Sequence, residues 1–412
     1  MTGETAISGK YAVYPEYKDS GVEWLGEVPI DWDIKKLKYI CKVQTGTKNT
    51  ENAVEEGMYP FFVRSQKVER INSFGADCEA VLTAGDGVGV GRVFHYIEGK
   101  FDYHQRVYML NNFGGVLGRF IYYYLSNNFY KVALEGNAKS TVDSLRLPQF
   151  LNFEFSLPKI EVQNTINDFL DHETAKIDTL IDKQQQLITL LKEKRQAVIS
   201  HAVTKGLNPN APMRDSGVEW LGEVPAHWET GNLRWFINIA SGEGLSNTEI
   251  ENFKYGKFEF RVIGGNGTMG FTQNVNTTNK AFAVGRVGAL CGNVHFVDEP
   301  CWITDNALKI SYWAQFDTEY LYFLLTAARL NDYASKSAQP LITGEQVKSL
   351  QAPIPPKSQQ VEIGRHIRSE LDKFAELISK NETAINLIKE RRTALISAAV
   401  TGKIDVRNWK AA

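Results

Sequence analysis

Three residues in the first half of the chain have the types and spacing of a nuclease metal site. Asp86 is followed by Glu98 and Lys100, and nucleases of the PD-(D/E)xK kind hold a metal with an Asp and a Glu beside a Lys. The matching stretch of the second half, GNVHFVDEPCW, has no lysine at that place. So short a motif often arises by chance. A charged surface turn is therefore the favoured interpretation, and a stand-alone DNA nuclease is the alternative.

Other patterns that could carry catalysis are incomplete. The glycine-rich run Gly85–Gly91 lacks the GK[ST] of a phosphate-binding loop, and strand-like residues follow it in place of a helix. The sequence contains no (N/D)PP(Y/F) tetrapeptide, with which amino-methyltransferases grip the flipped base. The four cysteines have no CxxC spacing, which argues against a structural zinc site and a disulfide framework. The sequence therefore predicts no catalytic, metal or cofactor site in this chain.

Polar loops between the expected strands suit DNA binding instead. Arg reads guanine and Asn or Gln reads adenine by paired hydrogen bonds, whereas Lys, Ser and Thr hold phosphates. For any single loop, an ordinary solvated surface is the alternative. The candidates in the first half are Arg64, Ser65, Gln66, Lys67, Arg92, His104, Gln105, Arg106, Lys139 and Ser140. Those in the second half are Arg261, Asn266, Thr268, Arg286, Asn293, Thr304, Asn306, Lys336 and Gln339.

The charge of the chain is low for a protein that binds DNA alone. The formal net charge is −2 over 412 residues. Residues 33–150 carry 15 basic and 12 acidic side chains, and residues 229–350 carry 10 and 12. Because neutralisation of phosphates supplies much of the affinity for DNA, we expect weak binding by this chain alone. Partner subunits would then supply the missing positive surface.

A long repeat organises the sequence. The phrase DSGVEWLGEVP begins at Asp19 and returns at Asp215, and Pro29 and Trp32 recur as Pro225 and Trp228. Far downstream, KEKRQAVISHAVT and KERRTALISAAVT agree at 9 of 13 positions. Between these blocks the halves diverge. Each half therefore has constant ends and a middle of its own.

Each downstream block ends a long amphipathic helix. Apolar residues recur in steps of three, four or seven, and each helix would run about 40 residues, or roughly 60 Å. So long an apolar stripe needs a partner, and the favoured partner is the twin helix, crossing antiparallel. Packing of each helix on its own domain is the alternative. The expected seam comprises Ile166, Leu170, Ile177, Leu180, Leu187, Leu191, Ile363, Ile367, Phe374, Leu377, Ile388 and Leu395.

The middles are typical of mixed domains, with short β-branched and aromatic strands followed by an aromatic helix. The expected strands lie at Tyr59–Val63, Val90–Tyr96, Val107–Leu110, Phe258–Ile263 and Val294–Val297. The sequence thus predicts an α+β fold: two globular mixed α/β domains separated by two long antiparallel helices that form a coiled coil, with an internal pseudo-two-fold repeat. The expected limits are an arm to 18, domains at 19–155 and 215–352, helices at 156–204 and 353–402, a linker at 205–214 and a tail at 403–412.

This order of parts resembles the specificity subunit of type I restriction–modification enzymes. The resemblance covers nearly the whole chain and is carried by DSGVEWLGEVPIDW and DSGVEWLGEVPAHW, by LPKIEVQNTI and IPPKSQQVEI, and by the two helix ends. In many members the prolines are followed by an EQ pair. Here that place reads Val162-Gln163 and Gln359-Gln360.

The resemblance implies a function without catalysis. Each middle would be a target-recognition domain for one half of a split, asymmetric DNA target, and the helices would be the spacer between them. Two methyltransferase subunits and motor–nuclease subunits would dock, and S-adenosylmethionine, ATP and Mg²⁺ would bind to those partners. A coiled-coil scaffold without a nucleic-acid role is the other alternative. The opening residues lack a secretory pattern and no stretch approaches ~20 apolar residues, so we expect a cytoplasmic protein.

Overall fold

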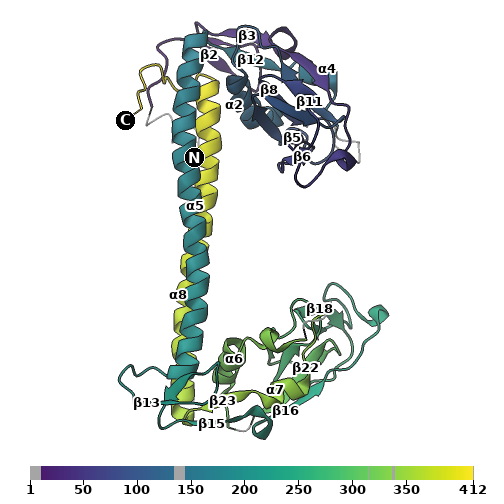
Figure 1. Ribbon diagram of the computed structural model, residues 1–412, viewed down its shortest axis with the longest axis vertical. Coiled ribbons are helices and arrows are strands. Elements are labelled where there is room, and N and C mark those ends of the chain that lie inside the picture. The colour runs from purple at the N-terminus through teal and green to yellow at the C-terminus, as the bar shows by residue number, and fades with distance from the viewer. Residues whose placement is uncertain (1–10, 134–143, 314, 336–338, 412) are drawn as a thin grey trace. The chain divides into compact units, whose positions relative to one another are not determined.

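The computed structural model describes residues 11–133, 144–313, 315–335 and 339–411 (Figure 1). The chain divides into two compact units, one formed by residues 1–185 and 382–412 and the other by residues 186–381. The two long helices, α5 (Ile160–Lys205) and α8 (Lys357–Val400), each contribute one part to both units. No helix in the described ranges is long and apolar enough to cross a membrane.

The first unit contains two small sheets. One has the strand order β4-β11-β8-β9 and is antiparallel, and the other has the order β6-β5-β10-β7, in which β5 and β10 are parallel. The strands are β1 (Tyr17–Asp19), β2 (Glu27–Pro29), β3 (Asp33–Lys36), β4 (Lys42–Thr45), β5 (Tyr59–Phe62), β6 (Glu69–Ile71), β7 (Ala76–Asp77), β8 (Ala80–Ala84), β9 (Phe94–Ile97), β10 (Lys100–Tyr103), β11 (Val107–Asn111) and β12 (Glu154–Leu157). The short helices are η1 (Leu37–Tyr39), η2 (Thr50–Asn52), α2 (Gly118–Asn128), α3 (Tyr130–Ala133) and α4 (Leu147–Leu151).

The second unit repeats this topology with one strand fewer among its described residues. Its antiparallel sheet has the order β16-β22-β19-β20, and its other sheet has the order β18-β17-β21, in which β17 and β21 are parallel. The strands are β13 (Met213–Asp215), β14 (Glu223–Pro225), β15 (Glu229–Asn232), β16 (Ile237–Ser241), β17 (Phe260–Gly264), β18 (Gly267–Thr272), β19 (Ala281–Gly285), β20 (Val294–Val297), β21 (Cys301–Ile303), β22 (Ala307–Trp313) and β23 (Gln351–Ile354). The short helices are η3 (Leu233–Trp235), η4 (Asn247–Glu249), α6 (Thr318–Ala327), η5 (Leu330–Tyr333) and α7 (Gly344–Ser349).

The expected fold class is confirmed, and the expected strand at Val90–Tyr96 departs most from its predicted limits. The strand predicted from Val90 begins only at Phe94. The backbone of Gly87 and Gly91 has positive φ angles of 78° and 71°, which favour glycine and turn the chain before the strand. The domain limits expected from the sequence stay predictions.

In each unit an aromatic helix lies between the sheet and the long helices (Figure 1). The aromatic residues Phe120 and Tyr124 of α2 are fully buried, as are Tyr320 and Phe323 of α6. Full burial of a large apolar side chain contributes about 1.5–3 kcal/mol. These helices therefore join each sheet to its section of the helix pair through a continuous apolar core.

Within each unit the two long helices pack antiparallel. In the first unit the early part of α5 shares a core with the late part of α8, and Leu170 and Ile396 are both fully buried there. The carboxylate of Asp178 also accepts hydrogen bonds from the Nε and the Nη2 of Arg392, at 2.8 and 3.1 Å. In the second unit the late part of α5 meets the early part of α8, where Val203 and Ile367 are fully buried in one core.

The helix seam departs from the strict heptad expected from the sequence. The expected seam residues that are buried are Ile166, Leu170, Ile363, Ile367, Phe374 and Leu395, and those half-buried are Ile177, Leu191 and Ile388. Three others, Leu180, Leu187 and Leu377, are 43%, 41% and 45% exposed. Ile188 and Ile385 are buried instead. A straight helix drifts by about 20° per heptad from a 3.5-residue repeat, which shifts the buried position by one residue in the middle of each helix.

The repeated phrase closes the end of a long helix in both units. In the first unit Trp32 and Pro29 pack against Gly402, and Lys403 donates from its Nζ to the carbonyl oxygen of Glu27 at 2.6 Å. In the second unit Trp228 packs against Gly206, and the Nζ of Lys205 donates to the carbonyl oxygen of Glu223. Trp32 and Trp228 are both only 2% exposed.

This arrangement explains why the phrase occurs twice. The first copy closes the end of α8, whereas the second copy closes the end of α5. Each unit thus contains one phrase and one helix end, drawn from opposite halves of the sequence. Trp24 and Trp220 add further contacts, since Trp24 stacks on Phe153 at 5.4 Å and Trp220 donates from its Nε1 to the carbonyl oxygen of Gln351 at 3.1 Å.

An ion pair joins the aromatic helix to the long helix in each unit, with opposite polarity. In the first unit the Nη2 of Arg119 on α2 lies 2.8 Å from Asp171 on α5. In the second unit Glu319 on α6 lies 3.0 Å from the Nη2 of Arg368 on α8. The charges at matching places are thus exchanged between the units.

Exchanging the charges of the second pair should test its contribution to stability. Arg368→Glu should lower the free energy of unfolding of the second unit by roughly 0.5–1 kcal/mol, because the pair is partly exposed and two carboxylates would then face each other. Adding Glu319→Arg should restore most of that loss. Urea unfolding of the complete chain measures both, with Arg365→Glu on the exposed face of α8 as a control. Equal stability of the single and double variants would show that the pair contributes nothing.

Candidate nucleic-acid interface

Three loops of the first unit converge at one end of its sheets. They follow β5 (63–68), follow β8 (85–93) and join β10 to β11 (104–106). Backbone and side-chain hydrogen bonds tie them together: the Gly85 N–H donates to the Arg106 carbonyl at 2.8 Å, and His95 Nε2 lies 3.0 Å from the Ser65 carbonyl. Most side chains of these loops are exposed. We call these three loops the first loop platform.

Asp86 lies at the centre of the first loop platform and holds two arginines. Its Oδ1 accepts from the Nη1 of Arg64 at 2.8 Å, and its Oδ2 accepts from the Nη1 of Arg106 at 2.6 Å. The Asp86 side chain is 18% exposed, whereas those of Arg64 and Arg106 are 43% and 59% exposed. Burial alone would raise the pKa of the Asp86 carboxyl, but the hydrogen bonds from the two arginines outweigh it and hold the pKa below its usual value.

Two other candidates on this platform have structural contacts. His104 is 5% exposed, and its Nδ1 accepts from the backbone N–H of Arg106 at 3.0 Å. Burial, together with the charge of Arg64, lowers the pKa of His104, so the ring is neutral at pH 7. Gln105 donates from its Nε2 to Asn49 Oδ1 at 2.5 Å. His104 therefore supports the turn from below, and only Gln105 is at the surface.

The remaining candidates of the first unit lie at the edge of the platform or outside the described residues. Gln66 donates from its Nε2 to the carbonyl oxygen of Arg92 at 3.4 Å, and the Ser65 hydroxyl donates to the Lys67 carbonyl at 3.1 Å. Lys67 is paired with Glu69 at 3.1 Å and is 77% exposed. The structure does not describe Lys139 and Ser140.

The second unit builds a platform of the same backbone design with different side chains. The Thr304 N–H donates to the Ile263 carbonyl as the His104 N–H does to Phe62, and the Arg286 N–H donates to the Asn306 carbonyl as Gly85 does to Arg106. Isolated bridges pair Asp86 with Ser144 and Val287 with Leu341. The places of Arg64, Asp86 and Arg106 are therefore taken by Gly265, Val287 and Asn306.

The loops of this second platform follow β17 (265–266), follow β19 (286–293) and join β21 to β22 (304–306), and they carry fewer polar side chains than those of the first. Arg286 donates from its Nη1 to the Ser241 hydroxyl at 3.1 Å, and its Nε is buried without a partner among the described residues. Asn266, Asn293 and Asn306 lie in the turns of this platform. Thr304 is 4% exposed, so this candidate is placed inside the domain and does not face solvent.

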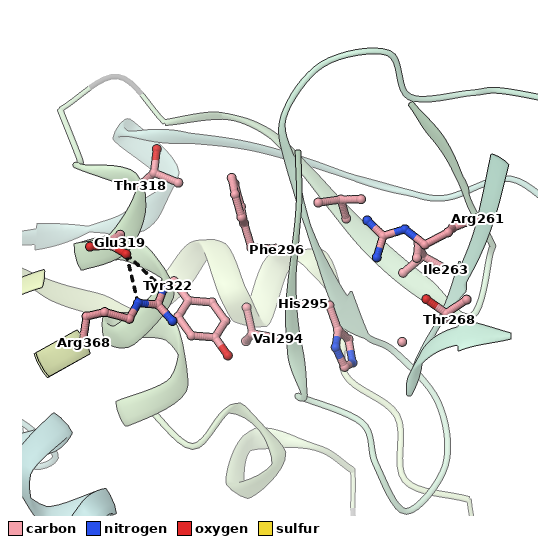
Figure 2. A pocket seen from close by; sticks show the side chains of 12 residues that line it. Arg261, Ile263, Thr268, Val294, His295, Phe296, Thr318, Glu319, Tyr322 and Arg368 are labelled. Atoms are coloured by element: carbon pink, nitrogen blue, oxygen red, sulfur yellow. Dashed lines mark hydrogen bonds and ion pairs between the residues drawn. The ribbon is translucent and has the colours of Figure 1, made fainter. Parts of the chain in front are cut away.

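Arg261 and Thr268 lie on a different surface. Both line a cavity of about 420 Å³ between β17, β18, β20 and α6, as Figure 2 shows. The Nη2 of Arg261 lies 2.8 Å from Glu299, and the ring of His295 lies beside Gly267. Arg261 is thus engaged in an ion pair beside this cavity and belongs to no platform loop. Gln339 is described but lies outside the platform loops, and Lys336 is outside the described residues.

The nuclease alternative is wrong, because its three residues point to separate partners. Both oxygens of Asp86 are occupied by arginines, Glu98 accepts from the hydroxyl of Tyr96, and the Nζ of Lys100 lies 4.8 Å above the ring of Phe74. Within the described ranges, no group of three or more His, Cys, Asp or Glu side chains could hold a metal ion.

Comparison with known families decides between the remaining interpretations. The family described as "Type I restriction modification DNA specificity domain" matches residues 29–190 and again residues 225–387. The chain belongs to this family. It is a non-catalytic DNA-specificity component of a type I restriction–modification system, with two copies of the specificity domain.

Relatives match along nearly the full length of this specificity subunit. The type I restriction enzyme EcoDI specificity subunit of Escherichia coli is 23% identical over 94% of this chain and 91% of its own. The MjaVIII specificity subunit of Methanocaldococcus jannaschii is 22% identical over 92% and 95%. A solved structure from work on complex assembly and conformational transition of the type I R-M system matches with a TM-score of 0.68 at 12% identity, over 90% and 98%. That likeness shows the fold.

The sequence did not reveal the structural roles of two residues, Asp86 and Gln163. Asp86 was considered only as a metal ligand, yet it orients two arginines. Gln163 was noted only for its place after the prolines, yet it is fully buried and joins α5 to the backbone before α2. The sequence signal that could have revealed the role of Gln163 is the recurrence of a polar side chain at the matching place of the second half, Gln360.

Proposed function

We propose that this chain reads a split, asymmetric sequence in duplex DNA, with one platform for each half of the target. The first loop platform would contact one half-site, and the platform around Arg286 and Asn306 would contact the other. Exposed polar loops on a rigid sheet are suited to base edges in the major groove. Two short half-sites read together add their discrimination, since each mismatch costs about 1–3 kcal/mol.

The difference between matching places of the two platforms carries this proposal. The frame is duplicated in strand order and in backbone hydrogen bonds, but Arg64, Asp86 and Arg106 are replaced by Gly265, Val287 and Asn306. Identical platforms would favour a target with two equal halves. Unlike side chains on equal frames favour two different halves.

The proposal includes partner subunits. A net charge of −2 gives weak attraction to phosphates, so basic surfaces of methyltransferase subunits would supplement it. Two such subunits would methylate adenine in the two half-sites with S-adenosylmethionine, and motor–nuclease subunits would bring ATP and Mg²⁺. We propose that α5 and α8 act as the spacer between the half-site readers and that the complex works in the cytoplasm.

Methylome sequencing of a host that carries this system tests the function directly. The expected result is methylated adenine in a bipartite motif with two different halves and a fixed gap, which disappears when the gene for this chain is deleted. Methylation that continues unchanged after deletion would contradict the proposal. Footprinting of the complex purified through a tag on this chain gives a second readout, because a scaffold without a nucleic-acid role would give no split footprint.

Substitutions on the two platforms should relax different halves of the target. Arg106→Ala should lower discrimination in one half only, and Asn306→Ala should do so in the other half only, each by about tenfold per base pair read. The measurement is methylation of a library in which each half-site is randomised in turn. Relaxation of the same half by both variants would contradict the assignment of one half to each unit.

A further inference from the structure

The first loop platform holds its two arginines in a manner that fits one kind of base. Each guanidinium of Arg64 and Arg106 uses only Nη1 for Asp86. Within the described residues no further ion pair or hydrogen bond engages their Nε and Nη2 groups, and both side chains are largely exposed. Each arginine therefore retains donors that a ligand can bind.

A fixed guanidinium is better suited to a base edge than to a phosphate. Arginine side chains lose about 2 kcal/mol of rotamer freedom when they are immobilised, and the contact with Asp86 restricts that freedom before DNA arrives. The same carboxylate cancels one of the two positive charges, which weakens sequence-independent attraction to phosphates. What remains is a pair of oriented donors, the pattern that matches the O6 and N7 acceptors of guanine.

The surroundings keep the arrangement rigid. Gly89 allows close approach of the loop after β8, because an added Cβ there would lie 2.5 Å from the carbonyl oxygen of Arg64. Gly46 does the same below the turn after β10, where a Cβ would lie 2.0 Å from the carbonyl oxygen of Tyr103. The loop after β8 is thus packed backbone to backbone against the loop after β5, and the hydrogen bond from the Gly85 N–H to the Arg106 carbonyl joins it to the third loop.

We propose that Arg64 and Arg106 read guanine in the half of the target bound by the first unit, and that Asp86 is the residue that positions them. This inference rests on the proposed function and adds the chemical identity of bases in one half-site. Asp86 acts through the two arginines, since each of its carboxylate oxygens accepts a hydrogen bond from one of them. The matching places of the second unit hold no guanidinium, so the requirement for guanine set by Arg64 and Arg106 applies to one half of the target only.

Base analogues in the methylated target test the proposal. The complex is purified through a tag on this chain, and its affinity is measured for duplexes in which single guanines are replaced by 7-deazaguanine, which lacks the N7 acceptor. The expected result is a loss of about tenfold or more at one or two guanines of the half-site that Arg106→Ala relaxes. Replacement of guanines in the other half should not show this dependence on Arg64 or Arg106.

Variants connect the guanines to the individual side chains. Arg64→Lys and Arg106→Lys keep the charge but lose the paired donors, so 7-deazaguanine should then cause little additional loss at the guanine that the altered arginine reads. Asp86→Asn should reduce the preference for guanine and, because it removes the carboxylate that cancels one of the two arginine charges, should make binding more strongly salt-dependent. Lys67→Ala, at an exposed lysine of the loop that contains Arg64, is the control. It should weaken DNA binding equally for all sequences.

The outcomes separate this inference from the function on which it rests. Absence of a bipartite target would end the proposed function. A bipartite target whose relevant half lacks guanine, or tolerates 7-deazaguanine throughout, would overturn the inference and leave the function standing. The inference also fails if Arg64→Lys and Arg106→Lys weaken binding equally for every sequence, because the arginines would then be phosphate contacts.

Discussion

Replacement of Gly402 by alanine is expected to lower the free energy of unfolding of the first unit by about 2–4 kcal/mol. Gly402 has a φ of 74°, a left-handed conformation that costs a residue with a Cβ roughly 1 kcal/mol. A Cβ there would also lie 2.4 Å from Cδ of Pro29 and 3.3 Å from Trp32. Relief of such a clash in a packed interior costs typically 1–3 kcal/mol more.

The second unit supplies a matched control at Gly206. Its φ is 73°, but an added Cβ would lie 3.1 Å from the edge of Trp228 and 3.8 Å from Pro225, the latter an ordinary contact distance. Gly206→Ala should therefore cost about 1–2 kcal/mol, most of it from the backbone. Hydrogen exchange of the complete chain in urea reports the loss in each unit separately. Equal losses for the two variants would show that the backbone conformation, and not the packing of the repeated phrase, sets the cost.

This pair of glycines also shows what the sequence could predict about the fold. The repeat, the long helices and their pairing follow from patterns that extend over many residues, and the structure confirms them. The sequence showed that Trp32 recurs as Trp228, but not that each phrase closes the helix of the opposite half. The pairing of each phrase with the helix of the opposite half depends on the antiparallel packing of the helices, which no short sequence pattern predicts.

The candidate interface could be predicted only in part, for a similar reason. The sequence identified the loops that contain Arg64 and Arg106, but their common partner Asp86 lies 22 and 20 residues away along the chain. Side chains so far apart meet only because β5 and β10 are parallel neighbours and β8 lies in the adjacent sheet. His104 and Thr304 were chosen for their polarity, yet the turns that carry them place both inside the domain.

Replacement of Gln163 by alanine is expected to destabilise the first unit by about 3 kcal/mol. The amide is fully buried; its Oε1 accepts from the Leu117 N–H at 2.9 Å, and its Nε2 donates to the Pro158 carbonyl at 2.8 Å. The variant would leave the Leu117 N–H and the Pro158 carbonyl without this partner, at about 1–3 kcal/mol each, and would also remove a longer contact of Nε2 with the Gly115 carbonyl at 3.4 Å. Urea unfolding measures the loss, and Gln360→Ala should reproduce it in the second unit, where the same contacts reach Asp317 and Pro355.

Gln163→Glu separates the lost donor from the lost acceptor. At neutral pH the introduced carboxylate keeps the acceptor for Leu117 but cannot donate to Pro158, and it is buried without a positive partner. Burial raises the pKa of such a carboxyl in the folded state, so the folded chain binds the proton more tightly than the unfolded chain. Stability should therefore be highest below the unfolded pKa of about 4.3 and fall as the pH rises through the folded pKa. A variant whose stability relative to the unaltered chain does not change with pH would show that the introduced carboxyl has the same pKa in the folded and unfolded chain, and so that position 163 is not shielded from water.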